Sequence, residues 1–268
     1  MAIKGPWVGS SAKSETGQSW MIAAGSVIKL YPTFWMSGMV GKSKDINVYI
    51  GSSDHNYNQS KLVNAVTAVM PQNQWSGVGL NLYINSGVQL VSDSNGSPCL
   101  NLAALSAFSK ITLINSGTIL GRGGIGASGG KGAGGGNGVI PDAGSAGGPA
   151  ISIGSANNWK VWIDNRGVIG GGGGGGGSAI ATAGGGGAPF GLKGNNAFGD
   201  AATSATYNAA GSGGRAGDNR GGAGGWYGAA GASGSGNLVQ PGNPAGAAIA
   251  YNGGNVTYIN AGTMYGSR

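Results

Sequence analysis

The sequence contains one cysteine and one histidine, and this scarcity narrows the chemistry that it can carry out. A single cysteine, Cys99, allows no internal disulfide, and its apolar neighbours favour a small core residue. A Ser–His–Asp triad would have to use His55, which stands in a polar stretch typical of a turn. No Cys/His cluster suits zinc, and no acidic loop matches a calcium-binding hand. We therefore expect no metal site, no cofactor and no enzymatic activity.

Acidic residues are also scarce, with eight Asp and Glu against fifteen Lys and Arg. No two acids stand at a spacing that suggests a paired general acid and base, although residues far apart in sequence can meet in space. The basic residues are scattered and form no stripe, which argues against nucleic-acid binding. The net charge of +7 would still favour approach to an anionic surface.

Long apolar runs are absent. The longest is far below the ~20 residues that span a membrane, and residues 1–4 lack the apolar core of a signal peptide. We expect a protein that is synthesised in a cytoplasm, inserts into no membrane, and reaches any outside location as part of a larger assembly.

Glycine is the abundant residue: the chain has 61, most of them after Leu120, and eight in a row at 170–177. Glycine this dense indicates either disorder or backbones packed so closely that a Cβ would clash. Flexible linkers lack large apolar residues and turn signals, whereas here the runs alternate with segments such as 189–193 and 238–241. We therefore predict short extended rods that reverse through loops and hydrogen-bond side by side. Disorder and a glycine-rich β structure are the alternatives. The match to G-x-G-x-x-G at 121–126 carries little weight, because no helix follows it.

Residues 1 to about 110 read as ordinary globular sequence. We predict a helix over 61–70 that is capped by Ser60, and a second helix that is capped by Ser97, has Pro98 at its first position, and carries Leu102, Leu105 and Phe108 on one face. The stretches 47–50 and 79–90 read as strands.

A repeat follows, in which an apolar strand leads through Asn-x-Gly into another apolar pair. Asn and Gly tolerate positive φ at a tight corner, so the repeat predicts stacked coils of a small β-solenoid. The last three copies bracket the glycine runs and would tie the rods to the globular part, as rungs near 111–120, 160–169 and 255–265. The four copies lie at 82–88, 113–119, 162–169 and 258–264.

The loops at the rod ends are free to carry recognition, because they need add nothing to rod packing. They combine aromatic side chains with Arg and Asn, a mixture that favours binding. The alternative is that Trp226 and Tyr227 pack against the bundle edge and that Phe190 belongs to a fixed turn.

With these features in view, the chain resembles the distal-tip adhesins of T-even-type bacteriophage long tail fibres. The resemblance covers essentially the whole length and lies in the order of its motifs. These are Gly-Pro-Trp-Val-Gly at 5–9, Glu-Thr-Gly-Gln-Ser-Trp-Met at 15–21, Asp-His-Asn at 54–56, the block at 170–177, and Gly-Gly-Gly-Gly-Ala-Pro-Phe-Gly at 184–191.

The resemblance implies a mixed α+β attachment domain at 1–120 and a receptor-binding domain at 121–268, built as a sandwich of polyglycine II helices joined to the β-solenoid-like rungs. One copy would cap a trimeric tail fibre at the distal end of the virion, after synthesis in the host cytoplasm. It would bind a porin-like outer-membrane protein and set host range. A fibre-assembly chaperone, a structural spacer and a glycan-binding tip are the alternatives.

Two sets of contact residues follow from this resemblance. The fibre-binding set is Trp7, Trp20, Trp35 and Met36, with burial in the domain's own core as the alternative for the tryptophans. The receptor-binding set is Asn195, Asn196, Phe198, Asp200, Tyr207, Arg215, Asp218, Arg220, Trp226, Tyr227, Leu238 and Gln240.

Overall fold

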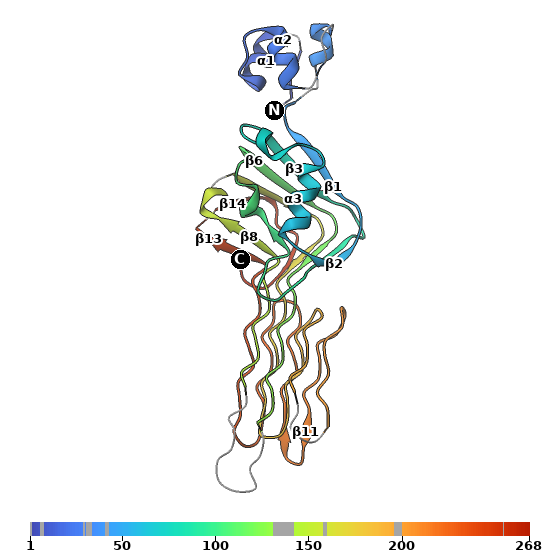
Figure 1. The fold of residues 1–268 in the computed structure, drawn as a ribbon, viewed down its shortest axis with the longest axis vertical. Helices are drawn as coiled ribbons and strands as arrows, with labels where there is room; N and C mark the ends of the chain where they lie inside the picture. The colour runs from blue at the N-terminus through green and yellow to red at the C-terminus, as the bar shows by residue number, and fades with distance from the viewer. Residues whose placement is uncertain are drawn as a thin grey trace.

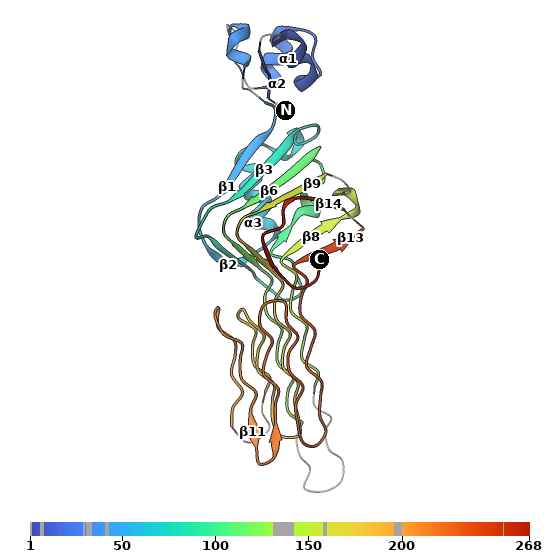
Figure 2. The same ribbon diagram turned by 180° about the vertical axis from the view of Figure 1, so that it is seen from behind.

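The protein is elongated, with a small helical unit at one end, a unit of parallel sheets in the middle, and a bundle of extended rods at the other end (Figures 1 and 2). The computed structural model describes residues 2–5, 8–28, 30, 34–40, 43–130, 142–157, 160–195, 200–253 and 255–268. The carboxyl terminus lies beside the sheets, so the chain returns from the rods before it ends (Figure 1).

The helical unit contains α1 (Val8–Thr16), α2 (Met21–Val27) and the 3-10 turn η1 (Met36–Met39). A small core holds them together, and Gly25 allows close contact, because a Cβ there would meet the Phe34 ring at 2.0 Å. Its buried members are Ile3, Ala12, Ala24, Ile28 and Met39. The side chain of Glu15 joins this unit to the chain that follows, accepting hydrogen bonds from the Ser43 hydroxyl at 2.7 Å and the Lys44 N–H at 3.2 Å.

The middle unit consists of parallel strands stacked in register. One five-stranded sheet has the order β1 (Ile46–Ile50), β3 (Gly79–Ile84), β6 (Lys110–Asn115), β9 (Val161–Asn165) and β14 (Val256–Asn260). A second has the order β15 (Thr263–Tyr265), β10 (Val168–Gly170), β7 (Thr118–Leu120), β4 (Gln89–Ser92) and β2 (Asp54–Tyr57). A third contains β13 (Ile249–Asn252), β8 (Ile151–Gly154) and β5 (Leu100–Asn101).

The four copies of the repeat occupy equivalent places in these sheets. Leu82 pairs with Leu113, and Leu113 with Ile163, so one column of apolar side chains fills the interior. At the corner, the Asn115 side-chain amide donates to the Asn165 Oδ1 at 2.8 Å. The glycine of the motif serves two purposes. In two copies it allows a positive φ, at Gly87 and Gly262. In the third copy it allows close packing, because a Cβ on Gly167 would lie 2.0 Å from the carbonyl oxygen of Gly117.

The first predicted helix is confirmed as α3 (Gln59–Thr67), but its cap is Asn58 and not Ser60: the Asn58 side chain accepts the Lys61 N–H at 3.1 Å. The second predicted helix is wrong. Residues 100–101 pair as a strand with β8, and only the short 3-10 turn η3 (Leu102–Leu105) follows. The three apolar residues of the predicted helix, Leu102, Leu105 and Phe108, are nevertheless buried in the core of the sheet unit. Two further 3-10 turns are η2 (Gln72–Gln74), between α3 and β3, and η4 (Ser155–Asn157), between β8 and β9.

The predicted strand over 79–90 is two strands, β3 and β4, separated by the corner at Gly87. Strands from both sides of residue 120 share both five-stranded sheets, so the sheet unit contains residues of both regions that the resemblance implies, 1–120 and 121–268. The predicted attachment region, 1–120, therefore contains two structurally separate parts, the helical unit and the first half of the sheet unit (Figure 1).

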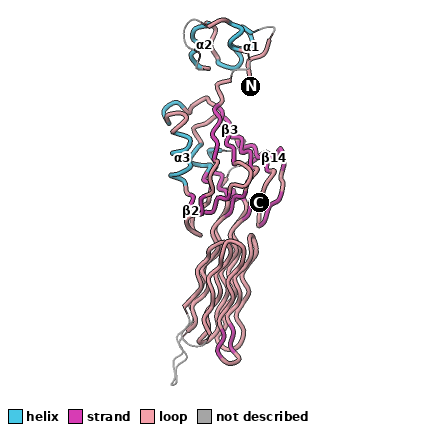
Figure 3. Tube along the Cα trace, turned by 90° about the vertical axis from the view of Figure 1, so that its right-hand side faces the viewer, coloured by secondary structure: helices cyan, strands magenta, loops and turns pink. Residues whose placement is uncertain are grey.

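The rods leave the sheet unit side by side and run to the far end of the molecule (Figure 3). They carry no helix or strand assignment over the described residues, apart from the short pair β11 (Arg215–Ala216) and β12 (Asn219–Arg220) at that far end. The extended segments are 121–130, 143–150, 171–177, 184–188, 191–195, 200–206, 209–214, 221–225, 228–234 and 239–247.

The rod at 171–177 lies in the centre of the bundle. Its N–H groups point in turn toward three neighbouring rods, and the direction repeats every third residue. The bonds are Gly171 to Tyr265 O, Gly174 to Ala229 O and Gly177 to Ala232 O; Gly172 to Gly148 O and Gly175 to Ser145 O; Gly173 to Ala188 O and Gly176 to Gly185 O. The carbonyl groups of this rod accept from three other rods, 121–130, 221–225 and 239–247.

Six neighbours leave this rod no open side. A Cβ on Gly172 would lie 2.0 Å from the Arg122 oxygen, one on Gly173 2.1 Å from the Gly225 oxygen, and one on Gly174 1.8 Å from the Asn243 oxygen. No real Cβ tolerates such distances, and the obstacle is backbone in every direction. Unbroken glycine at 171–177 is therefore a requirement of the central position.

Candidate functional site

The turns that join the rods lie at two ends of the bundle. The turns at 189–190, 207–208 and 226–227 adjoin the sheet unit, while those at 178–183, 215–220 and 235–241 lie at the far end, which we call the distal end. A rod of about seven residues at ~3.1 Å per residue separates the two ends by roughly 20 Å. Three residues of the predicted sets, Trp7, Asn196 and Phe198, lie outside the described residues.

An aromatic cluster occupies the end next to the sheets. The His55 ring packs between Phe190, with ring centroids 5.1 Å apart, and Tyr207, at 5.3 Å. Tyr227 packs on Trp226 at 4.3 Å and donates its hydroxyl hydrogen bond to the Tyr207 carbonyl oxygen. Burial raises the pKa of Tyr227 and of Tyr207. These contacts attach the rod turns to the sheet unit.

The structure therefore separates Tyr207, Trp226 and Tyr227 from the other described members of the predicted receptor set. For Trp226 and Tyr227 the sequence left packing against the bundle open as an alternative. In the structure both side chains pack there, and so does Tyr207. Trp226 keeps 41% of its surface exposed.

Arg122 makes contacts at this junction that sequence reasoning missed. Its guanidinium donates to the His55 oxygen at 3.3 Å, the Asn56 Oδ1 at 3.2 Å and the Ser92 oxygen at 3.2 Å, and it lies 5.7 Å from the centre of the Phe190 ring. One charged side chain thus joins the first rod to the edge of the second sheet. The only signal in the sequence was an arginine within a glycine run directly after a strand.

The distal end brings together seven predicted receptor residues that are distant in sequence: Asn195, Asp200, Arg215, Asp218, Arg220, Leu238 and Gln240. The Asp200 N–H donates to the Arg215 oxygen at 2.7 Å, and Arg215 pairs with Arg220 in the β11–β12 hairpin. The Arg220 N–H donates to the Ser235 oxygen at 2.9 Å, so the turn at 235–241 lies beside this hairpin.

Two further bonds complete the distal surface. The Gln240 N–H donates to the Ser178 oxygen at 2.7 Å, and the Gly129 N–H to the Asn195 oxygen at 2.9 Å. The backbone makes these contacts between turns, and most side chains of the set lie at the surface; the Arg215 Nε also donates to the Gly217 oxygen at 3.4 Å within its own hairpin. Leu238 is 51% and Val239 42% exposed, and the four charged residues are exposed as well. The surface combines two exposed apolar side chains, Leu238 and Val239, with charges of both signs, which suits protein recognition.

The helical unit exposes large apolar side chains at the opposite end of the molecule. Trp20 is 80% and Trp35 85% exposed, and Met36 is 44% exposed. Trp20, Met21 and Met36 also line a hollow of about 120 Å³. Burial in the domain's own core is thus wrong for these two tryptophans. Exposed apolar patches of this kind mark interaction surfaces.

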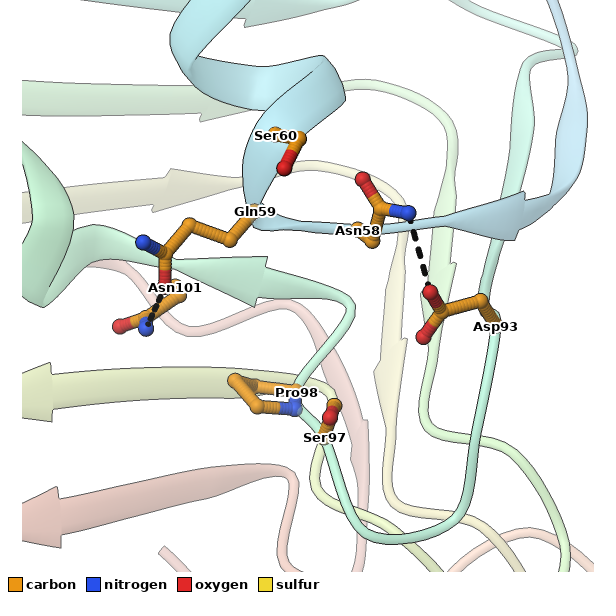
Figure 4. A pocket seen from close by; sticks show the side chains of 7 residues that line it. All are labelled: Asn58, Gln59, Ser60, Asp93, Ser97, Pro98 and Asn101. Atoms are coloured by element: carbon orange, nitrogen blue, oxygen red, sulfur yellow. Dashed lines mark hydrogen bonds between the residues drawn. The ribbon is translucent and has the colours of Figure 1, made fainter.

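A polar hollow of about 270 Å³ lies on the sheet unit at the start of α3 (Figure 4). In it the Asn58 amide donates to Asp93 Oδ2 at 2.9 Å, and the Asn101 amide to Gln59 Oε1 at 2.6 Å. Asp93 is the one carboxylate in its lining, so no paired general acid and base is present there. The lining residues are Asn58, Gln59, Ser60, Asp93, Ser97, Pro98 and Asn101.

Among the described residues, no group of three or more His, Cys, Asp or Glu side chains is placed to hold a metal ion. A search of the same residues finds no helix with the length and apolar character needed to cross a bilayer.

The family of the chain follows from comparison with known proteins. The family model described as phage tail fibre adhesin Gp38 matches residues 45–268, and the model of the Gp38 N-terminal domain matches residues 1–40. The chain belongs to the phage tail fibre adhesin Gp38 family. The shorter range covers the helical unit of this Gp38-family adhesin, and the longer one covers its sheets and rods.

Two relatives of the Gp38 family illustrate the match. A segment of 64 residues is 38% identical to the receptor-recognizing protein gp38 of Salmonella phage S16, and spans 24% of this chain and 26% of that protein. The whole chain resembles a chain in the crystal structure of the gp37-gp38 adhesin tip complex of the bacteriophage S16 long tail fiber. The TM-score is 0.63 at 31% identity, covering 99% of both chains. The arrangement of small helices and parallel sheets is therefore shared with that structure.

Proposed function

We propose that this chain is the receptor-binding adhesin at the distal tip of a long tail fibre, and that it binds an outer-membrane protein of a Gram-negative host and thereby sets host range. One observation carries the proposal. Residues from three parts of the chain, namely 195 and 200, 215–220, and 238 and 240, converge at the free end of the bundle, where all of the predicted receptor residues among them except Gln240 are exposed.

The rods explain why that surface is free to vary. Contacts between rods are made by backbone N–H and carbonyl groups, so the bundle depends little on the side chains of the distal turns. Substitutions in these turns would change what the tip binds and leave the rods in place. A scaffold of this kind suits a protein whose binding surface must follow a changing receptor.

The opposite end supplies the attachment to the fibre. Trp20, Trp35 and Met36 offer an exposed apolar surface on the helical unit, as far from the distal turns as the molecule allows. The S16 relative is described in complex with gp37. We propose that this surface binds the tip of a trimeric fibre, with one adhesin per trimer.

Two features of the fold belong to the same proposal. The three-residue repeat in the hydrogen bonds of the central rod is the period of a polyglycine II helix. The in-register pairing of β3, β6 and β9 supports a short β-solenoid as the base from which the rods extend. Together they would give a rigid arm between fibre and receptor.

Adsorption of the purified full chain to host cells tests this function. The panel consists of isogenic strains that each lack one outer-membrane protein, together with strains that have shortened surface sugars. We expect one protein deletion to abolish binding while the sugar mutants keep it. Loss of binding only in the sugar mutants would contradict a protein receptor, release of sugar fragments would contradict a purely binding role, and failure to bind any susceptible host would favour a spacer or an assembly chaperone.

A further inference from the structure

Leu238 has a backbone conformation that favours glycine. Its φ is +49°, and the described residues include only two other non-glycine residues with positive φ, Ala181 and Phe190. A Cβ in this region approaches the backbone closely, so side-chain-bearing residues seldom adopt it. Glycines such as Gly217, Gly228 and Gly236 occupy most positions of this kind in the chain. The presence of leucine at 238 therefore needs an explanation.

The fold itself supplies no such reason. Phe190 has the same kind of conformation, but its ring packs on His55 and lies near Arg122 at the base of the rods. Leu238, by contrast, is 51% exposed and belongs to neither hydrophobic core of the protein. Asn237 directly precedes it, and asparagine tolerates positive φ far better than leucine. The side chain is therefore held outward at a conformational cost and with little gain to the fold.

The surroundings of Leu238 indicate what it contacts. Val239 follows it and is 42% exposed, so the two residues form a small exposed apolar patch. The Asn237 N–H donates to Asn219 Oδ1 at 2.8 Å, which fixes the turn against the hairpin that bears Arg215 and Arg220. An apolar residue beside exposed guanidinium groups matches a partner surface with an apolar depression and a carboxylate at its edge.

We propose that Leu238 is the apolar anchor of the receptor contact. It inserts into an apolar depression on the exposed surface of the outer-membrane protein, and Arg220 pairs with a carboxylate beside that depression. This inference rests on the proposed function and adds the residue that determines specificity and the chemistry of its partner.

The variant Leu238→Gly tests the anchor, because it removes the side chain and relieves the backbone at once. We expect its thermal unfolding midpoint to stay level or rise, while adsorption to susceptible cells falls about tenfold or more. Ala181→Gly is the matched control: it makes the same backbone change at the same end, with φ +65°, and we expect adsorption to be unchanged. Leu238→Met, which keeps apolar length, should retain most of the binding.

The outcomes separate this inference from the function on which it rests. If the unmodified protein binds a receptor and Leu238→Gly binds equally well, the anchor is wrong and the function stands. If the unmodified protein binds no cell-surface protein, the function itself fails. Arg220→Glu tests the carboxylate: we expect weaker adsorption than with Arg268→Glu, an equal charge reversal beside the sheets, and equal effects would overturn the proposed pair.

Discussion

The guanidinium of Arg122 donates a hydrogen bond to the backbone oxygen of His55 at 3.3 Å, across 67 positions of sequence. Arg122 begins the first rod and His55 lies in the second sheet, so this contact fixes the rods to the sheet unit. The aromatic turns at Phe190 and Tyr207 close around the same histidine. We expect the rigidity of the rods relative to the sheets to depend on this junction.

Arg122→Ala should therefore loosen the rods from the sheets. It removes three hydrogen bonds from a partly buried cation, and we expect a loss of about 2 kcal/mol in the free energy of unfolding. Denaturant unfolding measures the loss. Arg166→Ala is the control, because Arg166 is a mostly exposed arginine paired with Asp164, and its effect should be clearly smaller. Equal effects would show that Arg122 is an ordinary surface charge.

The central rod gives a second prediction. Gly174→Ala places a Cβ 1.8 Å from the Asn243 oxygen, with backbone as the obstacle. We expect a loss above about 4 kcal/mol or failure to fold, seen as insoluble expression or a lowered unfolding midpoint. Gly96→Ala is the matched control, since a Cβ there meets nothing within 4 Å. A stable Gly174→Ala protein would contradict the packing of the bundle.

These glycines also show how far the sequence could lead. The run at 170–177 favoured packed rods over disorder and over a glycine-rich β structure, and the Asn-x-Gly repeat predicted strands that stack. The sequence did not reveal which turns share an end of the bundle. Tyr207 and Arg215 are only eight positions apart, yet one rod carries them to opposite ends, and the direction of each rod depends on its neighbours.

Failed predictions have similar causes. The stretch after Ser97 has helical spacing, but pairing of Leu100 and Asn101 with β8 prevails over local propensity. Arg122 was missed because its partners come from three distant segments. Leu238 was correctly placed among loop residues, but its strained backbone leaves no trace in the sequence.

The stacked asparagines of the corners give a third prediction. Asn165 is fully buried, and its amide donates to the Ala261 oxygen at 2.8 Å while its Oδ1 accepts from Asn115. Asn165→Ala should cost roughly 3 kcal/mol, because it leaves several buried groups without partners. The exposed Asn260 occupies the same place in the last copy, and Asn260→Ala should cost less than about 1 kcal/mol. Thermal unfolding of both variants measures the two losses of stability. Similar losses would contradict the conclusion that the stacked corner asparagines are buried and hydrogen-bonded.

Glu15 gives a prediction for pH. Burial alone would raise the pKa of Glu15, but hydrogen bonds, including those from Ser43 and Lys44, hold it below the ordinary value of 4.5. A carboxyl group whose pKa is lowered on folding stabilises the protein above its unfolded pKa, and this stability is lost as pH falls through the folded value. We therefore expect the helical unit to weaken below about pH 4.

Urea unfolding followed by helical circular dichroism, repeated from pH 6 to pH 3, measures this effect. Glu15→Gln should be less stable than the unmodified protein at pH 6 and should approach it at pH 3. Parallel pH profiles for the two proteins would show that another group is responsible.

Exchange of the segment that carries the predicted receptor residues tests the central claim most directly. Residues 194–245 are replaced by the corresponding segment of a relative with a different host, the sheet and helical units are retained, and phage carrying the chimera are scored on both hosts. We predict that host range follows the exchanged segment while assembly onto the fibre is unchanged. A chimera that assembles on the fibre and keeps the original host range would contradict the account.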